Sequence, residues 1–591
     1  MTVNTTVTNS QTINVNLMAD RQLQFGNFSR TPTATLFING NITALSSNTT
    51  LQFCGFAPVE VAGTLASKIG KITKWAANTV RFAGTNNHTG LTEILSGSLV
   101  AASPSALGTM ASGTVVSNGG TLAFASGVQY TSAEALTLAG DGDAGWTGAV
   151  DVEGNGAASF GGPITLADDA TLGCGSAMGT LTLSGNISGT NSLQKGGAGL
   201  LVLGGSNSFV GLTINTGAVL ATNSAALGAA AGTVLIQNTA QLRLNNNITN
   251  NNPIQLEGAT AGVILLMNSG GTNRLNGLVG LLGGGFDYGI AATAGKLTLA
   301  GGIAFTDVFS STRNVRLSGD GEGSVSGSIQ NGGSATVAIA KEGAGQWTLA
   351  GTNSYTGATT VSAGTLLING TSASAVTVSG GTLGGSGVIS NRITISSGIH
   401  LPGASVGVQT IWSNYVVSAG GTLKININGT NVDSHYSQVA VRNGNSGTVT
   451  LSGGLNVVAS PGLATNTVFT IIDNDGNDAV SGTFAGLANN ATFFQSGYTW
   501  RISYVGGDGN NVTLTILAAP QPALETLWSA PSFVLSWPDW ASAYSLYSTT
   551  NLTPPSIWLS VTNSPVLNSN KWSVALPVGS TGIQFFRLMW P

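Results

Sequence analysis

Closely spaced acidic residues are the first candidates for catalysis in this chain of 591 residues. Three pairs fall within one short span: Asp141 with Asp143, Asp151 with Glu153, and Asp168 with Asp169. Glycoside hydrolysis needs two facing carboxylates, and lyase chemistry usually adds acidic metal ligands and a nearby basic residue. No Lys or Arg occurs between residues 82 and 194. A polysaccharide-degrading enzyme is therefore kept only as an alternative function.

The strand periodicity separates these pairs. Because alternate residues of a strand share a face, Asp151 and Glu153 could project together, whereas the adjacent Asp168 and Asp169 could not. We therefore predict no catalytic residue, and Asp151 is the acid to test first.

A second acidic group has the composition of a cation-binding loop. It consists of Asp473, Asp475, Asn477 and Asp478 around Gly476. Alternating oxygen-bearing side chains around a glycine are typical of calcium loops, but the bidentate Glu that completes an EF-hand is absent. A hairpin turn whose Asp and Asn side chains cap their own backbone explains the same residues. We therefore predict no metal or cofactor, with calcium as the alternative.

The remaining reactive side chains are few and scattered. His88, His400 and His435 are too widely separated to predict a site, and Cys54 and Cys174 have no zinc-ligand spacing. We expect both cysteines to be buried apolar residues and His88 to pack within the fold. No cofactor-binding residue is predicted.

Three copies of one pattern form the framework on which any such residue must lie. They are KWAANTVRFAGTNNHTG at 74–90, KGGAGLLVLGGSNSFVG at 195–211 and KEGAGQWTLAGTNSYTG at 341–357. Each copy has a Lys, apolar residues two apart as in a strand, then Gly, Asn, a ring and Gly, as in a tight corner. A recurring period of this size predicts stacked rungs that contact only their neighbours.

Composition agrees with a β-solenoid and excludes other classes. The chain has 85 Gly but only 7% charged residues, and no long amphipathic helix is visible. The net charge of −4 has no basic stripe, so nucleic acid is not an expected partner. No apolar run is long enough to span a bilayer, so no transmembrane segment is predicted. The first residues lack a basic region followed by an apolar stretch, so no secretory signal peptide is expected in them.

The pattern changes along the chain and predicts four parts. These are a parallel β-helix at 1–420 with repeats near 74–108, 195–228 and 341–370, the end of the helix with antiparallel capping hairpins at 421–518, a proline-containing linker at 519–525, and a small tryptophan-rich β-sandwich at 526–591.

The third copy resembles the autotransporter-associated β-strand repeat, also called the passenger-associated transport repeat. The residues that fit its pattern are Lys341, Gly343, Gly345, Leu349, Gly351, Asn353, Tyr355, Thr356, Gly357, Gly364, Thr365 and Leu366. The second copy departs at Val210, and the first has Ala76 and Asn78 in place of the early glycines. The resemblance implies a right-handed parallel β-helix exported to a bacterial cell surface or to the medium.

These observations predict an exported, noncatalytic, elongated β-helix that acts as a structural or adhesive protein at the cell surface. Sparse charge limits repulsion, so glycans or other surface proteins are the expected partners. Two alternatives stay open: a polysaccharide lyase or glycoside hydrolase, and a carbohydrate-binding protein that uses the tryptophan-rich C-terminal part. The sequence does not predict an oligomeric state.

Overall fold

The computed structural model describes residues 1–308, 310–529, 531–568, 570–577 and 583–589. These residues form β-strands joined by turns, with two 3₁₀ turns, η1 (Gly444–Ser446) and η2 (Asp539–Ala541), and no α-helix among them. The chain divides into two compact units, Met1–Val376 and Thr377–Pro591. No helix in the described ranges is long and apolar enough to cross a membrane.

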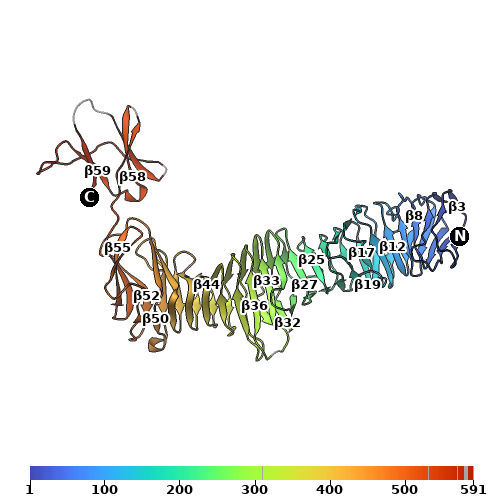
Figure 1. Ribbon diagram of the computed structural model, residues 1–591, viewed down its shortest axis with the longest axis horizontal. Coiled ribbons are helices and arrows are strands. Elements are labelled where there is room, and N and C mark those ends of the chain that lie inside the picture. Colours follow the sequence, from blue (N-terminus) through green and yellow to red (C-terminus); the bar gives the residue numbers. More distant parts are fainter. Residues whose placement is uncertain (309, 530, 569, 578–582, 590–591) are drawn as a thin grey trace. The chain divides into compact units, whose positions relative to one another are not determined.

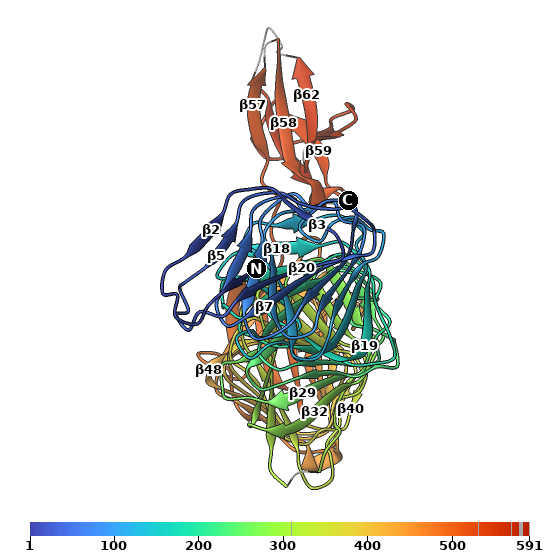
Figure 2. The same cartoon turned by 90° about the vertical axis from the view of Figure 1, so that its right-hand side faces the viewer.

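The first unit is a parallel β-helix, the fold that the repeats predicted (Figure 1). Strand β10 (Thr79–Phe82) pairs in parallel with β8 (Val59–Val61) of the preceding rung and with β12 (Gly97–Ala101) of the following rung. Val80 is therefore level with Val59 and Leu99. Figure 2 looks onto the N-terminal rungs, where β2 (Gln11–Ile13), β5 (Leu36–Ile38) and β7 (Thr49–Gly55) lie over the later coils.

Each repeat supplies four strands, two to each of two successive rungs. The first strand pairs with the third and the second with the fourth. The strands are β9 (Ile69–Lys74), β10, β11 (Leu91–Ile94) and β12 in the first repeat; β22 (Leu193–Lys195), β23 (Leu200–Leu203), β24 (Leu212–Ile214) and β25 (Gly217–Ala221) in the second; and β38 (Val337–Lys341), β39 (Gln346–Leu349), β41 (Thr359–Val361) and β42 (Thr365–Ile368) in the third.

The core of each rung is made by the apolar side chains that stand two apart in the sequence. In the third repeat these are Trp347 and Leu349, both fully buried. Equivalent positions also stack between rungs: Phe25, Phe53 and Phe82 form a column with ring centroids 5.4 Å apart at each step. The core therefore grows by one layer with each rung, which explains how a long chain avoids a single large core.

The second unit combines parallel and antiparallel pairing. Parallel rungs include β46 (Ile393–Pro402) with β48 (Tyr415–Ile427) and β49 (Gln438–Val441) with β52 (Val468–Asn474). Parallel pairing extends to Gly482, within the part predicted as the end of the β-helix and its cap. The sheet that contains β49 and β52 ends in antiparallel pairing, in the order β52, β56 (Asn511–Ala518), β55 (Tyr498–Gly506) and β54 (Thr492–Gln495).

The C-terminal residues of the second unit form two small antiparallel sheets, one of them visible in Figure 2 through β57, β58 and β62. The first sheet holds β57 (Glu525–Ser529), β58 (Ser532–Pro538), β62 (Lys571–Pro577) and β61 (Val566–Asn568); the second holds β60 (Leu559–Ser560), β59 (Ser545–Thr549) and β63 (Phe585–Met589). Trp537 is buried in their core, and Trp540 and Trp572 pack against it, whereas Trp528 is exposed.

Candidate functional site

The repeat lysines are buried rather than exposed. The Lys341 Nζ donates hydrogen bonds to the carbonyls of Glu342 at 2.6 Å, Gly343 at 2.8 Å and Ala363 at 3.1 Å. Two of these carbonyls belong to its own corner, and the third belongs to the corner of the next rung. Burial lowers the pKa of Lys341 to about 8. The ammonium group therefore connects two successive corners and is inaccessible to a substrate.

The other two copies repeat this lysine cage. Burial lowers the pKa values of Lys74 and Lys195 to about 8 as well. Their acceptors are the carbonyls of Trp75, Ala76 and Ser96, and of Gly196, Gly197 and Thr216. Ala76 thus preserves the cage without the usual glycine, and it takes a φ of 71° to do so.

The repeat asparagines connect three successive rungs. Asn353 Oδ1 accepts from the Ile329 N–H of the preceding rung at 3.0 Å, and its Nδ2 donates to the Thr371 carbonyl of the following rung at 3.0 Å. Asn86 and Asn207 make the corresponding contacts with Leu65 and Ala106, and with Ile187 and Ala226. Each amide thereby satisfies one donor and one acceptor that a buried corner would leave unpaired.

The glycine that precedes each asparagine lies against the backbone of the rung before it. A Cβ on Gly351 would stand 2.2 Å from the Gly327 carbonyl oxygen. Similar distances of 2.3 Å for Gly84 and 2.2 Å for Gly205 show that the close approach recurs. No side chain fits at this position without displacing a rung.

The ring position is matched to a second buried residue. His88 Nε2 lies 3.2 Å from Thr92 Oγ1, and Tyr355 Oη lies 2.6 Å from Thr359 Oγ1. All four residues are fully buried. Burial lowers the pKa of His88 to about 4, so the ring is neutral near pH 7. His88 is therefore a packed part of its rung.

The second repeat replaces this polar pair with an apolar one. Phe209 occupies the ring position, and Leu212, the first buried residue after the corner, takes the place of the threonine. A following glycine covers the ring in the first two repeats: a Cβ on Gly108 or Gly228 would come within 2.7 Å of the ring atoms of His88 or Phe209. The repeat residues thus build the stack and hold no reaction centre.

The acidic candidates Asp151 and Glu153 do not form a catalytic pair. Asp151 is buried, and its Oδ2 accepts from Thr147 N and Oγ1, both at 2.8 Å. Glu153 instead pairs with Arg81 of the first repeat at 2.5 Å. Strand β17 (Val150–Val152) ends before Glu153, and the two carboxylates are held by different partners.

The other acidic pairs are also engaged separately. Asp141 accepts from Thr171 Oγ1 at 2.6 Å, while Asp169 accepts from the Ser192 N–H at 2.7 Å. Asp168 and Asp169 are exposed beside each other and have no basic partner among the described residues. Within the described ranges, no group of three or more His, Cys, Asp or Glu residues could hold a metal.

The remaining histidines and the cysteines make no shared site. His400 Nδ1 lies 2.9 Å from Tyr415 Oη, and burial lowers the pKa of His400 to about 3. His435 is exposed and contacts its neighbour Ser434. Cys54 and Cys174 are both buried and free.

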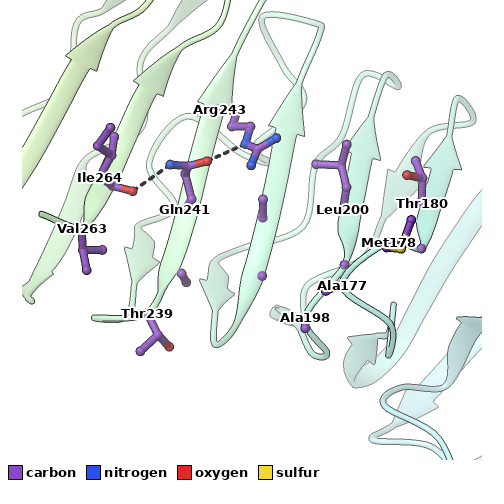
Figure 3. Close-up of a pocket in the computed structure, with 15 residues that line it drawn as sticks. Ala177, Met178, Thr180, Ala198, Leu200, Thr239, Gln241, Arg243, Val263 and Ile264 are labelled. Carbon is purple, nitrogen blue, oxygen red and sulfur yellow. Dashed lines mark hydrogen bonds between the residues drawn. The ribbon is translucent and has the colours of Figure 1, made fainter. Parts of the chain in front are cut away.

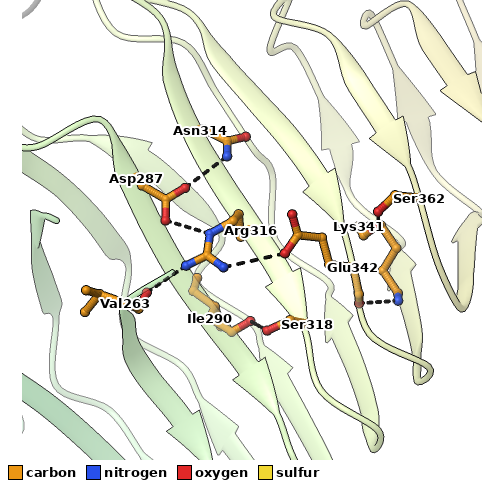
Figure 4. Close-up of polar contacts among 9 residues, drawn as sticks. All are labelled: Val263, Asp287, Ile290, Asn314, Arg316, Ser318, Lys341, Glu342 and Ser362. Atoms are coloured by element: carbon orange, nitrogen blue, oxygen red, sulfur yellow. Dashed lines mark hydrogen bonds and ion pairs between the residues drawn. The ribbon is translucent and has the colours of Figure 1, made fainter. Parts of the chain in front are cut away.

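A polar cluster with mixed charges lies on the flank of the first unit (Figure 4). Arg316 Nε pairs with Asp287 Oδ2 at 2.6 Å, and its Nη1 lies 3.5 Å from Glu342 Oε2. Asp287, Arg316 and Glu342 belong to three successive rungs. Because each charge has an opposite neighbour, the cluster links rungs and leaves no unpaired acid for catalysis.

A shallow groove of about 510 Å³ also lies on the first unit (Figure 3). Gln241 Nε2 donates to the Ile264 carbonyl at 2.8 Å, and Arg243 Nε donates to Gln241 Oε1 at 2.5 Å. Met178 and Thr180 line another part of the groove. None of its lining residues carries a carboxylate. The groove offers amide, hydroxyl and guanidinium donors without the acids that sugar hydrolysis requires.

The loop with the calcium-like composition joins β52 to the following residues. Asp473 pairs with Arg442 at 2.7 Å, and Asp475 Oδ2 accepts from the Gly444 N–H at 3.1 Å. The Asn477 N–H donates to Asn445 Oδ1 at 2.7 Å. Three of the four residues singled out in the sequence therefore contact the segment 442–445. The fourth, Asp478, bonds within the loop through its carbonyl, which accepts from Asn474 Nδ2.

Comparison with known proteins identifies the repeats. The sequence model of the passenger-associated-transport-repeat matches residues 72–101, 193–221 and 339–368. The chain therefore contains three passenger-associated-transport-repeats, as the sequence predicted. The second match has 29 residues against 30 in the others, which agrees with the shorter spacing from Phe209 to Leu212.

Two proteins described as adhesins are similar to this chain. The adhesin BmaC autotransporter of Brucella suis biovar 1 (strain 1330) is 38% identical over 117 residues, which are 20% of this chain and 3% of that protein. The chain thus spans a small part of the relative's length. The crystal structure of the Haemophilus influenzae Hap adhesin aligns with 85% of this chain and 64% of its own, at 11% identity and a TM-score of 0.27. The fold assignment rests on the strand pairing described above.

Proposed function

We propose that this chain is an exported, noncatalytic β-helix that acts as an adhesive or structural protein at a bacterial surface. One observation carries the proposal: the residues that define the repeats are buried and bonded to neighbouring rungs. The lysine, the asparagine and the ring of each repeat thereby hold the rungs together as a rigid scaffold. Such a scaffold leaves its outward positions free for contact. The match of the repeats and the adhesin name of the similar Brucella suis protein support this proposal.

Outward polar side chains supply a recognition surface. Amides of successive rungs pair with one another, as Asn276 does with Asn251 at 2.7 Å and Gln22 with Gln52 at 2.7 Å. Such ladders fix the outward hydrogen-bonding groups at the spacing of the strands, about 4.8 Å. A rigid polar surface with few charges suits glycans, whose hydroxyl groups both donate and accept hydrogen bonds.

The groove near Gln241 and Arg243 is the first surface to test. The full chain should be screened against a panel of bacterial and host glycans for binding and for depolymerisation in the same samples. We expect binding without cleavage products. Arg243→Ala should weaken that binding, while the matched control Arg274→Ala, an exposed arginine bonded to Asn276, should not.

The same experiment separates the alternatives. Release of shorter glycans, lost in Asp168→Asn with Asp169→Asn, would contradict the noncatalytic proposal and favour the enzyme. Binding that survives Arg243→Ala but is lost in Trp528→Ala would favour the C-terminal carbohydrate-binding alternative, because Trp528 is 67% exposed.

A further inference from the structure

The loop after β52 faces the hairpin between β55 and β56. Strand β52 pairs antiparallel with β56, and β56 pairs with β55. The Asn474 N–H donates to Asn511 Oδ1 at 2.7 Å, which fixes the start of the loop against the end of the hairpin. Both segments are therefore held together by the cap's own strand pairing.

Backbone carbonyls and side-chain amides converge between these segments. Asn510 Nδ2, from the hairpin, lies 3.4 Å from the Asp475 carbonyl oxygen and 3.2 Å from those of Gly476 and Asp478. Asn474 Nδ2 lies 2.9 Å from the same Asp478 carbonyl. Two amides, one at the end of β52 and one in the hairpin turn between β55 and β56, thus donate to one turn of backbone.

Four buried side-chain oxygens in this place accept no hydrogen bond from the described residues. They are Asn474 Oδ1, Asp475 Oδ1, Asp478 Oδ1 and Asn510 Oδ1. Asn474 is 1% exposed and Asn510 is 4% exposed, so water does not readily supply the missing donors. Buried acceptors without partners are rare in folded proteins, and four between this loop and the facing hairpin require an explanation.

The charges of the cluster also indicate a bound cation. Asp473 has Arg442 as its partner, but Asp475 and Asp478 have no ion pair among the described residues. Two carboxylates held beside several carbonyl dipoles create a strongly negative site. A bound cation would satisfy the carboxylates and the unpaired oxygens together.

We propose that Asn474, Asp475, Asp478 and Asn510 bind one Ca²⁺ ion. Calcium takes six to eight oxygen ligands from carboxylates, amides and backbone carbonyls in flexible geometry, and this is the mixture present here. Magnesium prefers a smaller octahedral shell with retained water and is the poorer match. Both amides turn Nδ2 to these carbonyls without the ion, so binding requires each amide to rotate, which gives up those hydrogen bonds and presents Oδ1 to the turn instead.

The site would fasten the loop to the hairpin at the antiparallel end of the β-helix. Extracellular calcium modules commonly bind with dissociation constants of about 10⁻⁴–10⁻³ M. We expect binding in that range. This inference does not depend on adhesion, because it concerns the stability of the cap.

Calcium titration of the full chain tests the proposal. Isothermal titration calorimetry with CaCl₂, and with MgCl₂ in parallel, should show one calcium site and at least tenfold weaker magnesium binding. The wild-type melting temperature should be higher in 10 mM CaCl₂ than in EDTA. Absence of both the calcium heat and the melting shift would overturn the proposal, and so would equal binding of magnesium.

A double variant locates the site. Asp475→Asn with Asp478→Asn keeps side-chain size and removes both charges, so calcium affinity should fall at least tenfold. Asp168→Asn, at an exposed aspartate of the other unit, should bind calcium as the wild type does. Unchanged affinity in the double variant would place the ion elsewhere and contradict the assignment. The wild-type comparison of calcium with EDTA remains decisive if the double variant does not fold.

Discussion

The hydroxyl oxygens of Tyr355 and Thr359 lie 2.6 Å apart inside one rung of the third repeat. The same geometry joins His88 to Thr92 in the first repeat, whereas the second repeat replaces both polar partners with Phe209 and Leu212. The ring and the residue after the corner therefore change together. In these repeats a polar ring lies in the core where a buried threonine hydroxyl is its hydrogen-bond partner, because an unpaired polar group is costly to bury.

This coupling predicts a double-mutant cycle in the first repeat. His88→Phe should leave the Thr92 hydroxyl buried without its partner and cost about 1–3 kcal/mol. Adding Thr92→Leu reproduces the pair of the second repeat and should recover most of that loss. Urea unfolding of the four proteins measures the coupling. Additive effects of the two substitutions would show that the pair is not a unit.

The lysine cage predicts a large cost for removing one charge. Lys341→Met keeps most of the side-chain volume but leaves three buried carbonyls without their donor, so we expect a loss of about 2–4 kcal/mol. The matched control is Lys296→Met, because Lys296 makes an exposed pair with Glu322 and should lose no more than about 1 kcal/mol. Equal losses would refute the structural role of the cage.

The same lysines predict a dependence of stability on alkaline pH. Burial lowers their pKa from 10.5 to about 8, so between these values the folded chain has released protons that the unfolded chain still holds. Their contribution to the free energy of unfolding should therefore rise from pH 8 to pH 10.5. Urea midpoints across this range should rise less in Lys341→Met than in the wild type. A parallel response of both proteins would contradict the assignment.

At acid pH the buried histidines give a pH dependence of the same sign. The pKa of His88 falls from 6.5 to about 4 in the folded chain, so its contribution to stability is present above pH 6.5 and is lost as the pH falls towards 4. The variant His88→Phe with Thr92→Leu should lose less stability over this interval than the wild type. His435→Gln, at an exposed ring, should follow the wild-type curve.

The close approach of each repeat glycine to the preceding rung predicts that this position does not tolerate a methyl group. Gly351→Ala places a Cβ 2.2 Å from the Gly327 carbonyl oxygen and should cost about 1–3 kcal/mol or more. Gly145→Ala is the control, since its new Cβ would lie 3.6 Å from its nearest neighbour, Asp143 Oδ2. Thermal melting distinguishes the two variants. A harmless Gly351→Ala would mean that the rungs are more loosely stacked than described.

The sequence was most informative where a pattern is local. Apolar residues two apart, such as Trp347 and Leu349, predicted strands, and the Gly and Asn residues that follow predicted a corner. Repetition of that unit then predicted the stack. The boundaries at residues 420, 519 and 526 came from changes in alternation, proline content and composition and remain predictions, because such changes are gradual while strand pairing is set by contacts.

Residues brought together from distant rungs could not be predicted. Arg81 pairs with Glu153 because the stacking of several rungs brings these two positions close together. No spacing in the sequence indicates this ion pair. The burial of the lysine at the start of each repeat could not be predicted from the sequence either. Only part of the proposed calcium site could be predicted from the sequence, because Asp475 and Asp478 belong to the acidic loop whereas Asn510 lies in the separate hairpin turn between β55 and β56.

In-register stacking of the rungs is the claim on which the rest depends, and chemical cross-linking tests it directly. Thr182 is level with Val202, and Val202 with Leu220, all on outward positions of β20 (Thr180–Leu183), β23 and β25. A thiol-reactive bis-methanethiosulfonate that spans about one strand spacing, 4.8 Å, should link Thr182→Cys to Val202→Cys rapidly, because each cysteine thiolate displaces one sulfinate group from the reagent and forms a disulfide with it. It should not link Thr182→Cys to Leu220→Cys, two rungs away. Equal linking of both pairs, or of neither, would contradict the stacked β-helix.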